Sequence, residues 1–487
     1  MMKSKKCLFL LPFLLVGCNS TKPSDDGGGK QKDENCYIKE DTTIDFLCLS
    51  DSSYSSLLED IIEEFQENEP HVTVRICNPQ GLGKYGMISK TVFAQFFEGD
   101  YPDLVQCYPD DAIRYLSFKD GKYMVNLDKY LNHKDYGLSV EDKKDYIASF
   151  VNEGNHYPVE GTYSLPFCKS SELMYYNADV LIDLDLSSVD NSINGGNPLT
   201  AQYLDSLTWE ELFNKLAPAI LTYNESLDEK HKIIDTSEEN AVFTYDSDEN
   251  FFITLAFQYG YGYTSVNDGV PSVDFNNQEM RDLMQVIKTA KNNHYLHTNG
   301  SYGNYVSNLF TARKNLFTVS STAGLTYNYN ADDPFSIGVA RIPHAEGKEY
   351  MAINQGPSVC VLDHQDENRS LASYLLWKHM TNKSNSLVWA LKTGYSGIRN
   401  SNYTDQQYID ALTPKEGQSL FDHAQMENLK KLADVFDKLY TTAVFNGSSN
   451  VRTNVGNLIK GCLNLDVEID KLFDYYASVE TKAIYSI

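Results

Sequence analysis

Three short motifs carry residue types that hold nucleotides or metals in other proteins. The glycines of GLGKYG at 81–86 have the spacing of a dinucleotide-binding turn, but they follow the second predicted strand, after a lengthened turn. The run DSDEN at 246–250 alternates oxygen ligands as a calcium loop does, yet it lacks the later glycine and glutamate. His294 and His297 have no third ligand near them in the sequence. We therefore predict no metal and no cofactor.

Catalytic motifs are equally weak. The GxSxG and HExxH sequences of serine and zinc hydrolases do not occur. Aspartate and glutamate together number 67, so carboxylate pairs of the glycosidase type are available by count, but no spacing singles one out. We predict a binding protein rather than an enzyme, and we name no catalytic residue.

Tyrosine is the more informative residue type. The chain has 34 tyrosines, and several, including Tyr54, Tyr108 and Tyr395, fall in predicted loops. An aromatic ring stacks on the C–H face of a sugar, and tyrosine adds a hydroxyl that forms hydrogen bonds. A general preference for tyrosine explains the total, but it explains the clustering at strand ends less well. These positions favour a carbohydrate-binding cleft.

A parallel sheet is the element that would bring these loops together. Apolar runs at 44–49, 72–76 and 104–107 predict strands, and the segments between them have the period of amphipathic helices. This alternation predicts a parallel sheet with right-handed crossovers. Ligands of such sheets bind beyond the carboxyl ends of the strands, where Asp51 and Asp110 lie. Helical spacing predicts helices at 53–68, 87–97, 208–216, 278–293, 371–380 and 426–440.

Length, charge and cysteine content narrow the class of protein. Without residues 1–17 the chain has 470 residues, which is too long for a single core, so two lobes are expected. Loss of the three lysines in this segment takes the formal net charge from −26 to −29, the reverse of the basic stripe of a nucleic-acid binder. The seven cysteines after Cys18 are scattered and have no CxxC spacing, so we predict that most are core residues rather than a disulfide framework.

The first 40 residues predict an anchor rather than a transmembrane helix. Residues 1–17 combine three lysines with an apolar run of about ten residues, the length of a signal-peptide core and about half of a membrane span. The sequence LVGC, ending at Cys18, is similar to the lipobox of bacterial lipoproteins, whose cysteine is lipidated. Residues 18–40 are rich in Ser, Gly, Lys and Asp, which predicts a flexible tether. We expect a lipid-anchored protein on the outer face of the cell membrane.

A series of short motifs follows in order along the chain: YPDLV at 101–105, YSLPF at 163–167, LMYYN at 173–177, LTWEEL at 207–212, GVARIP at 338–343 and TGY at 393–395. These motifs resemble those that family 1 extracellular solute-binding proteins, the maltose-binding and glycerol-phosphate-binding type that serves ABC importers, carry over about 400 residues. After the TGY motif, Gly397 stands where the family usually has proline. Each motif alone is weak, but their order and spacing make the resemblance strong.

The resemblance implies an α/β, two-lobed periplasmic-binding-protein-like (type II) fold with a hinge and a central cleft. Lobe one is expected to comprise residues 41–169 plus 341–382, and lobe two residues 170–340 plus 383–487. A ligand that contacts both lobes only when they are shut would stabilise the closed form.

The resemblance also implies which residues contact the ligand. A tryptophan is common in the family just after Ser320, and here Ala323 and Gly324 stand in that region, which argues against a broad oligosaccharide platform. The expected ligand-binding residues are Asp51, Tyr54, Tyr108, Asp110, Ser170, Asp248, Asn250, Phe251, Ser320, Gln355, Gly356, Tyr395 and Arg452.

The implied partners are a small-molecule carbohydrate, either a neutral sugar or a short oligosaccharide, and the ABC permease subunits; we expect a monomer that binds no nucleic acid. Arg452 and Arg399 keep a glycerol-phosphate or glycerophosphodiester ligand open, because guanidinium groups bind phosphate in a bidentate fashion. The net charge of −29 weighs against an anionic ligand. A surface-anchored glycoside hydrolase and an adhesin are the less favoured alternatives.

Overall fold

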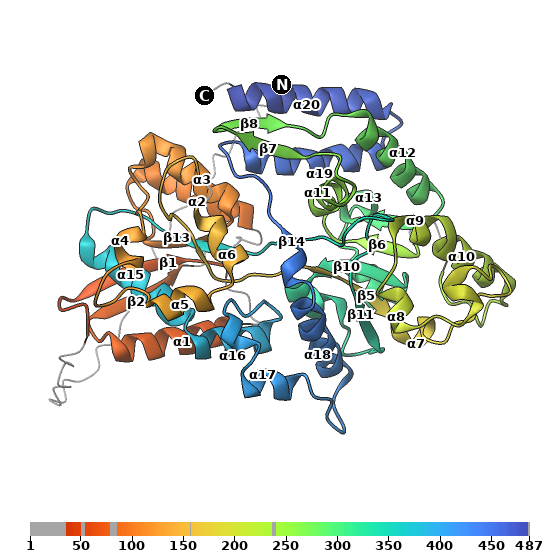
Figure 1. The fold of residues 1–487 in the computed structure, drawn as a ribbon, viewed down its shortest axis with the longest axis horizontal. Coiled ribbons are helices and arrows are strands. Elements are labelled where there is room, and N and C mark those ends of the chain that lie inside the picture. The colour runs from red at the N-terminus through yellow and green to blue at the C-terminus, as the bar shows by residue number, and fades with distance from the viewer. Residues whose placement is uncertain (1–35, 50–53, 78–84, 156, 236–239, 486–487) are drawn as a thin grey trace, which may run out of the picture.

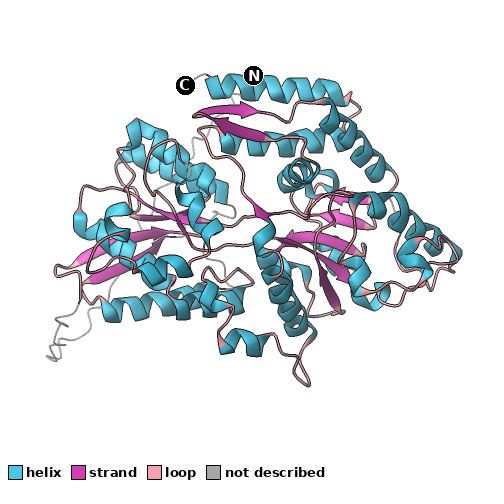
Figure 2. Cartoon of the chain, viewed as in Figure 1, coloured by secondary structure: helices cyan, strands magenta, loops and turns pink. Residues whose placement is uncertain are grey.

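Two five-stranded sheets, each covered by helices, form two lobes that lie side by side (Figures 1 and 2). The structure, a computed structural model, describes residues 36–49, 54–77, 85–155, 157–235 and 240–485. Helices account for much of both lobes, and the strands lie at their centres. The two-lobed α/β fold expected from the sequence is confirmed.

The sheet of lobe one has the order β2–β1–β3–β13–β4. β1 is parallel to both β2 and β3, which confirms the parallel sheet predicted for the N-terminal region. β13 returns to this sheet from far along the chain and pairs antiparallel with β3 and β4. The strands are β1 (Thr42–Leu47), β2 (Val72–Cys77), β3 (Leu104–Cys107), β4 (Leu165–Pro166) and β13 (Ser358–Val361).

Amphipathic helices cover this sheet. α1 (Ser55–Asn68) buries an apolar stripe, including Leu58 and Ile62, in a cluster shared with β1 and α15 (Glu367–Met380). α2 (Tyr85–Glu98) and α3 (Pro109–Ser117) pack on a second cluster beside β3. The predicted helices at 53–68, 87–97 and 371–380 are thus present, with bounds that differ by a few residues.

The sheet of lobe two has the order β11–β5–β10–β6–β9. β5 pairs antiparallel with both of its neighbours, β10 and β11. β10, β6 and β9 are parallel. The strands are β5 (Glu172–Asn177), β6 (Phe243–Tyr245), β9 (Leu296–Thr298), β10 (Phe317–Ser321) and β11 (Ile337–Ala340).

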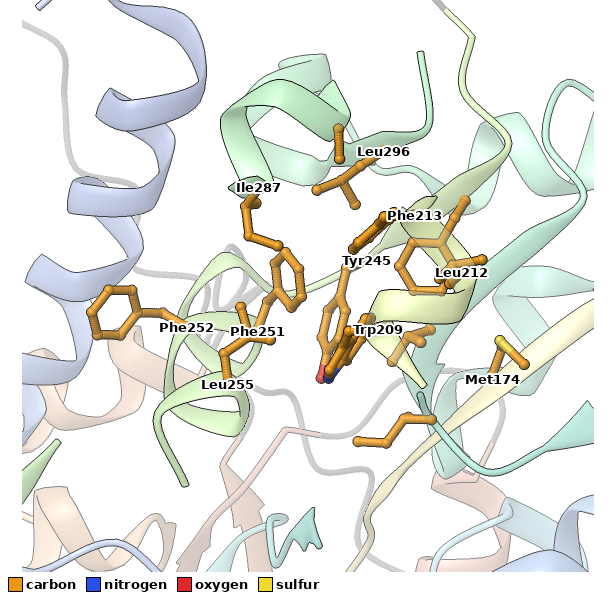
Figure 3. Close-up of a cluster of buried hydrophobic side chains, with 14 of the residues drawn as sticks. Met174, Trp209, Leu212, Phe213, Tyr245, Phe251, Phe252, Leu255, Ile287 and Leu296 are labelled. Carbon is orange, nitrogen blue, oxygen red and sulfur yellow. The ribbon is translucent and has the colours of Figure 1, made fainter. Parts of the chain in front are cut away.

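Aromatic side chains fill the core of lobe two (Figure 3). Thr208 caps α9 (Trp209–Glu211) by accepting a hydrogen bond from the Glu211 amide, as the sequence predicts. Trp209 is buried, and its indole nitrogen donates to Gln258 Oε1 at 2.7 Å. This bond satisfies the one polar group of the side chain and so permits its burial.

Further helices and short strands complete the described structure. The helices are α4 (Asp128–Leu131), α5 (Val140–Asp145), α6 (Ala148–Asn152), α7 (Ala178–Leu181), α8 (Ala201–Leu204), α10 (Ala217–Ser226), α11 (Asp248–Tyr259), α12 (Gln278–Asn292), α13 (Asn299–Tyr302), α14 (Ser307–Thr311), α16 (Lys383–Thr393), α17 (Gln406–Ala411), α18 (Leu420–Ala433), α19 (Ser448–Asn464) and α20 (Ile469–Tyr485). The remaining strands are β7 (Thr264–Asn267), β8 (Val270–Val273), β12 (Ala352–Ile353) and β14 (Leu439–Tyr440).

Two segments pack on the lobe opposite to the one expected. Residues 341–353 belong with lobe two, because Ile342 and Ile353 lie in its core. α16 belongs with lobe one, because Trp389 packs there against Phe167. The chain therefore changes lobe near residue 354 rather than 341, and after α16 rather than after residue 382. The other limits of the expected division stay a prediction.

The helix expected at 426–440 ends earlier, because α18 stops at Ala433 and the chain then forms β14. β14 pairs with β12 midway between the two lobes (Figure 1). No helix in the described part of the chain is long and apolar enough to cross a bilayer.

Candidate functional site

A small cavity lies where the two lobes meet the segments that cross between them. It encloses about 40 Å³. Its walls come from the start of α3 in lobe one, from the crossing segments and from the start of α19 in lobe two. Acidic, basic and amide side chains all contribute. The lining residues are Tyr108, Pro109, Asp110, Glu153, Ile353, Asn354, Gln355, Gly356, Thr441, Thr442, Val444 and Arg452.

Lobe one contributes the first turn of α3. Pro109 starts this helix directly after β3, which places Tyr108 and Asp110 at the carboxyl end of a parallel strand. Burial raises the pKa of Tyr108 to about 12, so its hydroxyl keeps its proton and remains a donor. Burial also raises the pKa of Asp110, although a hydrogen bond from the Ser448 hydroxyl opposes this shift. Because Ser448 begins α19, that bond joins the two lobes directly.

Lobe two contributes a chain of hydrogen bonds that ends at Arg452. The guanidinium donates to Oδ1 of Asn250 on α11. The amide nitrogen of Asn250 donates to Glu172 Oε1 at 2.5 Å and to Gln355 Oε1 at 2.9 Å. These two bonds leave Oδ1 to accept from the arginine. Burial lowers the pKa of Arg452, but the charge of Asp110 and neighbouring groups raises it by more, so the cavity holds a permanent cation.

Glu172 is the buried carboxyl group at the base of this chain. It begins β5, is 2% exposed and accepts a second hydrogen bond from the Tyr245 hydroxyl at 2.5 Å. Burial raises the pKa of Glu172 to about 7, although the hydrogen bonds from Tyr245 and Asn250 lower it. The group therefore changes charge near neutral pH.

This shift gives a stability that depends on pH. Between about pH 4.5 and 7 the folded chain holds a proton on Glu172 that the unfolded chain has released. Stability therefore falls as the pH rises through this window, by about 3 kcal/mol in total. We expect the free energy of unfolding of the wild type, obtained from melting curves, to fall by this amount across the window relative to that of Glu172→Gln. The glutamine amide resembles the protonated acid and does not titrate. A difference between the two proteins that is constant from pH 5 to 8 would contradict the assignment.

Two crossing segments run antiparallel beside the cavity. The Ser170 amide donates to the Gln355 carbonyl at 2.9 Å, and the Gln355 amide donates back at 3.0 Å. Gly356 follows with φ of +95°, and a Cβ at this position would lie 2.0 Å from the carbonyl oxygen of Cys168. Glycine is therefore required where these segments touch.

A buried ion pair holds the same crossing. The Lys169 side chain is 0% exposed and donates to Glu153 and to the Gly356 carbonyl, the latter at 3.0 Å. The other carboxylate oxygen of Glu153 accepts from Asn354 Nδ2 at 2.8 Å. Glu153 lines the cavity, so this pair links the cavity wall to both crossing segments.

The comparison with known families decides the class of protein. The model of the family described as bacterial extracellular solute-binding protein matches residues 60–414, which is more than half of the chain. This chain belongs to that family. No curated protein sequence matches it.

Solved structures of solute-binding proteins share the fold. UgpB from Mycobacterium tuberculosis, in complex with glycerophosphocholine, has a TM-score of 0.67 at 16% identity, covering 91% of this chain and 98% of UgpB. An ABC substrate-binding protein from Listeria monocytogenes, in complex with cycloalternan, has a TM-score of 0.68 at 14% identity over 91% and 99% of the chains. Maltose-bound MalE3 from T. maritima has a TM-score of 0.65 at 14% identity over 90% and 99%. At these identities the likeness shows the fold.

The structure of this solute-binding protein brings most of the expected cleft residues to one place. Ser170 and Asn250 do not line the cavity, but each is hydrogen-bonded to Gln355. The expected residues that line the cavity are Tyr108, Asp110, Gln355, Gly356 and Arg452.

Three expected aromatic contacts lie in other surroundings. Phe251 is fully buried and stacks on Tyr245 in the core of lobe two (Figure 3). It therefore cannot stack on a ligand in the cavity, and that expectation is wrong. Tyr54 and Tyr395 contact each other edge to face beside Trp389, away from the cavity lining.

The expected polar contacts at Ser320 and Asp248 are used within lobe two. Ser320 donates to Asp246 at 2.5 Å. Asp248 accepts from the Thr298 hydroxyl at 2.5 Å and from the Gly300 amide at 2.7 Å. The Asp246 and Asp248 carboxylates of the DSDEN run at 246–250 therefore accept hydrogen bonds from other parts of the protein. Within the described residues, no group of three or more His, Cys, Asp or Glu side chains is placed to hold a metal ion.

Other expected positions give no cleft contact. Arg399 is buried in lobe one, where it donates to Asp142 at 3.1 Å and to the Thr381 carbonyl at 2.7 Å. It is a packing residue and does not support a phosphate ligand. Asp51, Cys18 and most of the 81–86 motif lie outside the described residues.

Four charged or polar residues in or beside the cavity were missed by sequence reasoning. Lys169 and Glu172 lie in the five residues between the YSLPF and LMYYN motifs, and their charge in that short segment was the available signal. Glu153, which lines the cavity, and Ser448, which binds Asp110, carry no such signal, because each lies in a polar stretch of ordinary composition.

Proposed function

We propose that this solute-binding protein captures a carbohydrate, a neutral sugar or a short oligosaccharide, between its lobes and delivers it to an ABC permease. The observation that carries the proposal is the cavity whose polar walls come from both lobes and from the crossing segments. Tyr108 and Arg452 supply donors, and Asp110 supplies an acceptor. A polyhydroxylated ligand needs such partners, because each buried hydroxyl without one is costly.

The closed arrangement of the cavity supports a hinge mechanism. Pockets for small ligands usually enclose roughly 300–1,000 Å³, many times the about 40 Å³ found here. A sugar therefore enters when the lobes separate at the crossing segments near Ser170, Gln355 and Tyr440, and closure then surrounds it. A permease that binds both lobes would recognise the closed form.

A glycerophosphodiester is the second candidate. Arg452 places a permanent cation in the cavity, and the structure of UgpB, which has the same fold, holds glycerophosphocholine. The carboxylates of Asp110 and Glu153 line the same cavity and disfavour an anionic ligand. We therefore rank the neutral carbohydrate first, and we propose no catalytic role.

A thermal-shift panel tests the function. Maltose, maltotriose, cyclic glucans and glycerophosphocholine are each added to the full chain. A ligand at 100 times its Kd adds about 2.7 kcal/mol to the stability of the folded state, which raises the melting temperature by several degrees. Scattering should also show compaction with the same compound. A panel in which no compound changes either quantity would count against the proposal.

The anchor is a separate proposal. We propose that Cys18 carries a lipid and that residues 18–40 tether a monomeric receptor to the outer face of the cell membrane. Cys18→Ala should move the protein from the membrane fraction to the medium, and an unchanged distribution would contradict the anchor.

A further inference from the structure

Cys107 and Cys360 meet in lobe one, behind the wall of the cavity. Cys107 ends β3 directly before Tyr108, and Cys360 lies in β13, shortly after Gly356. In the antiparallel register Cys107 is opposite Ser358, and Cys360 is opposite Val105. Residues directly opposite each other share a face of the sheet, and so do residues two apart on one strand. Because Cys360 is two residues after Ser358, both thiols project from the same face, in diagonal positions.

The two sulfur atoms are already in contact. Their separation is 3.0 Å, and both residues are buried, at 2% and 0% exposure, in an apolar cluster with Val105 and Leu362. A disulfide needs a separation of about 2.04 Å, which a movement of about 0.5 Å by each sulfur supplies. Both sulfur atoms therefore lie within a short movement of bonding distance.

We propose that Cys107 and Cys360 form a disulfide in the mature protein. The family is extracellular, and disulfides persist in oxidising compartments. The oxidant is the disulfide of an extracytoplasmic thiol oxidoreductase or of oxidised glutathione. One protein thiolate attacks this disulfide to give a mixed disulfide, and the second protein thiolate then displaces the remaining sulfur of the oxidant. One S–S bond forms in the protein and one breaks in the oxidant, which accepts two electrons and two protons and leaves with both of its sulfurs as thiols.

The order of folding sets when this bond forms. Burial raises the pKa of the Cys107 thiol well above its ordinary value, so the folded, reduced chain exposes little reactive thiolate. Oxidation therefore accompanies the docking of β13 on β3. The bond joins residues 253 apart in the sequence and fixes the end of β3 against β13. It thereby holds two walls of the cavity, Tyr108–Asp110 and Gln355–Gly356, in register.

Peptide mass spectrometry tests the bond directly. The full chain, secreted or refolded with a glutathione redox pair, is unfolded without reductant and treated with N-ethylmaleimide. The peptides of Cys107 and Cys360 should appear linked and lighter by two hydrogen atoms than the sum of the two thiol peptides. Cys48, Cys168 and Cys462 serve as internal controls that carry the label. Complete labelling of Cys107 and Cys360 in protein folded under oxidising conditions would overturn the proposal.

A second measurement tests the effect of the bond. Wild-type protein refolded with reductant should melt at least roughly 5 °C below protein refolded without it. Cys168→Ser, which removes another buried thiol of lobe one, should keep this difference, and Cys107→Ala combined with Cys360→Val should abolish it. Equal melting temperatures of the oxidised and reduced wild type would overturn the stabilising role.

Discussion

Lys169→Met is expected to lower the free energy of unfolding by about 3–5 kcal/mol, because it leaves a buried carboxylate without its cation. The Lys169 side chain is fully buried and binds Glu153 as well as the Gly356 carbonyl. After the substitution Glu153 keeps the hydrogen bond from Asn354, but the charge is no longer compensated. The midpoint of urea unfolding measures the loss.

A double-mutant cycle separates this effect from lost packing. Glu153→Gln combined with Lys169→Met removes both charges, so it should recover much of the stability lost in the single variant. Lys383→Met is the matched control, since Lys383 is half exposed and binds Asp405 at 2.9 Å on the surface. That variant should lose at most about 1 kcal/mol. A Lys169→Met protein that is no less stable than the control would show that the pair contributes nothing.

The lysine of this pair also joins the two crossing segments. Lys169 and Gly356 lie on the two antiparallel segments, and the ammonium of Lys169 donates a hydrogen bond to the Gly356 carbonyl that holds them together. In the proposed hinge mechanism, we expect rotation in the residues that flank this contact.

The elements of lobe one were predictable because their signals are local. The apolar stripe of 53–68 and the strands around it depend on the period of neighbouring residues, and the structure has α1 and β1–β3 there. The parallel order followed from the alternation of strands and helices. The prediction of a helix up to residue 440 was wrong because β14 forms by pairing with β12. That pairing joins residues far apart in the sequence, and no local period indicates it.

The site was predictable in part, for a similar reason. Tyr108 and Asp110 follow a strand of a parallel sheet, and topology alone places such residues at its ligand-binding edge. The prediction that Phe251 contacts the ligand was wrong because this residue, one position after Asn250 on the helix, faces the core instead of the cleft. The contact of Asp110 with Ser448 depends on how the two lobes close, and no residue pattern encodes that geometry.

Arg452→Met is expected to weaken ligand binding by roughly 30-fold or more, because it removes a partly buried, hydrogen-bonded charge from the cavity wall. The guanidinium binds Asn250, which is itself held by Glu172 and Gln355, so it is positioned before the ligand arrives. Isothermal titration with the compound that stabilises the wild type gives the Kd. Arg281→Met is the control, since that arginine binds Asp470 and Asp474 at a remote surface of lobe two. Binding by Arg452→Met within twofold of the wild type would exclude this role.

Arg452→Lys then distinguishes the two ligand classes. Lysine keeps the charge but loses the planar fork that matches a phosphate with two parallel hydrogen bonds. A phosphodiester should therefore bind Arg452→Lys more than tenfold less tightly than the wild type and show a strong dependence on salt. A neutral sugar, which needs one donor from this position, should lose less than tenfold and be insensitive to salt. Equal melting temperatures of Arg452→Lys and the wild type check that the variant is folded, and its loss of affinity together with the salt dependence of binding then reports whether the ligand is charged.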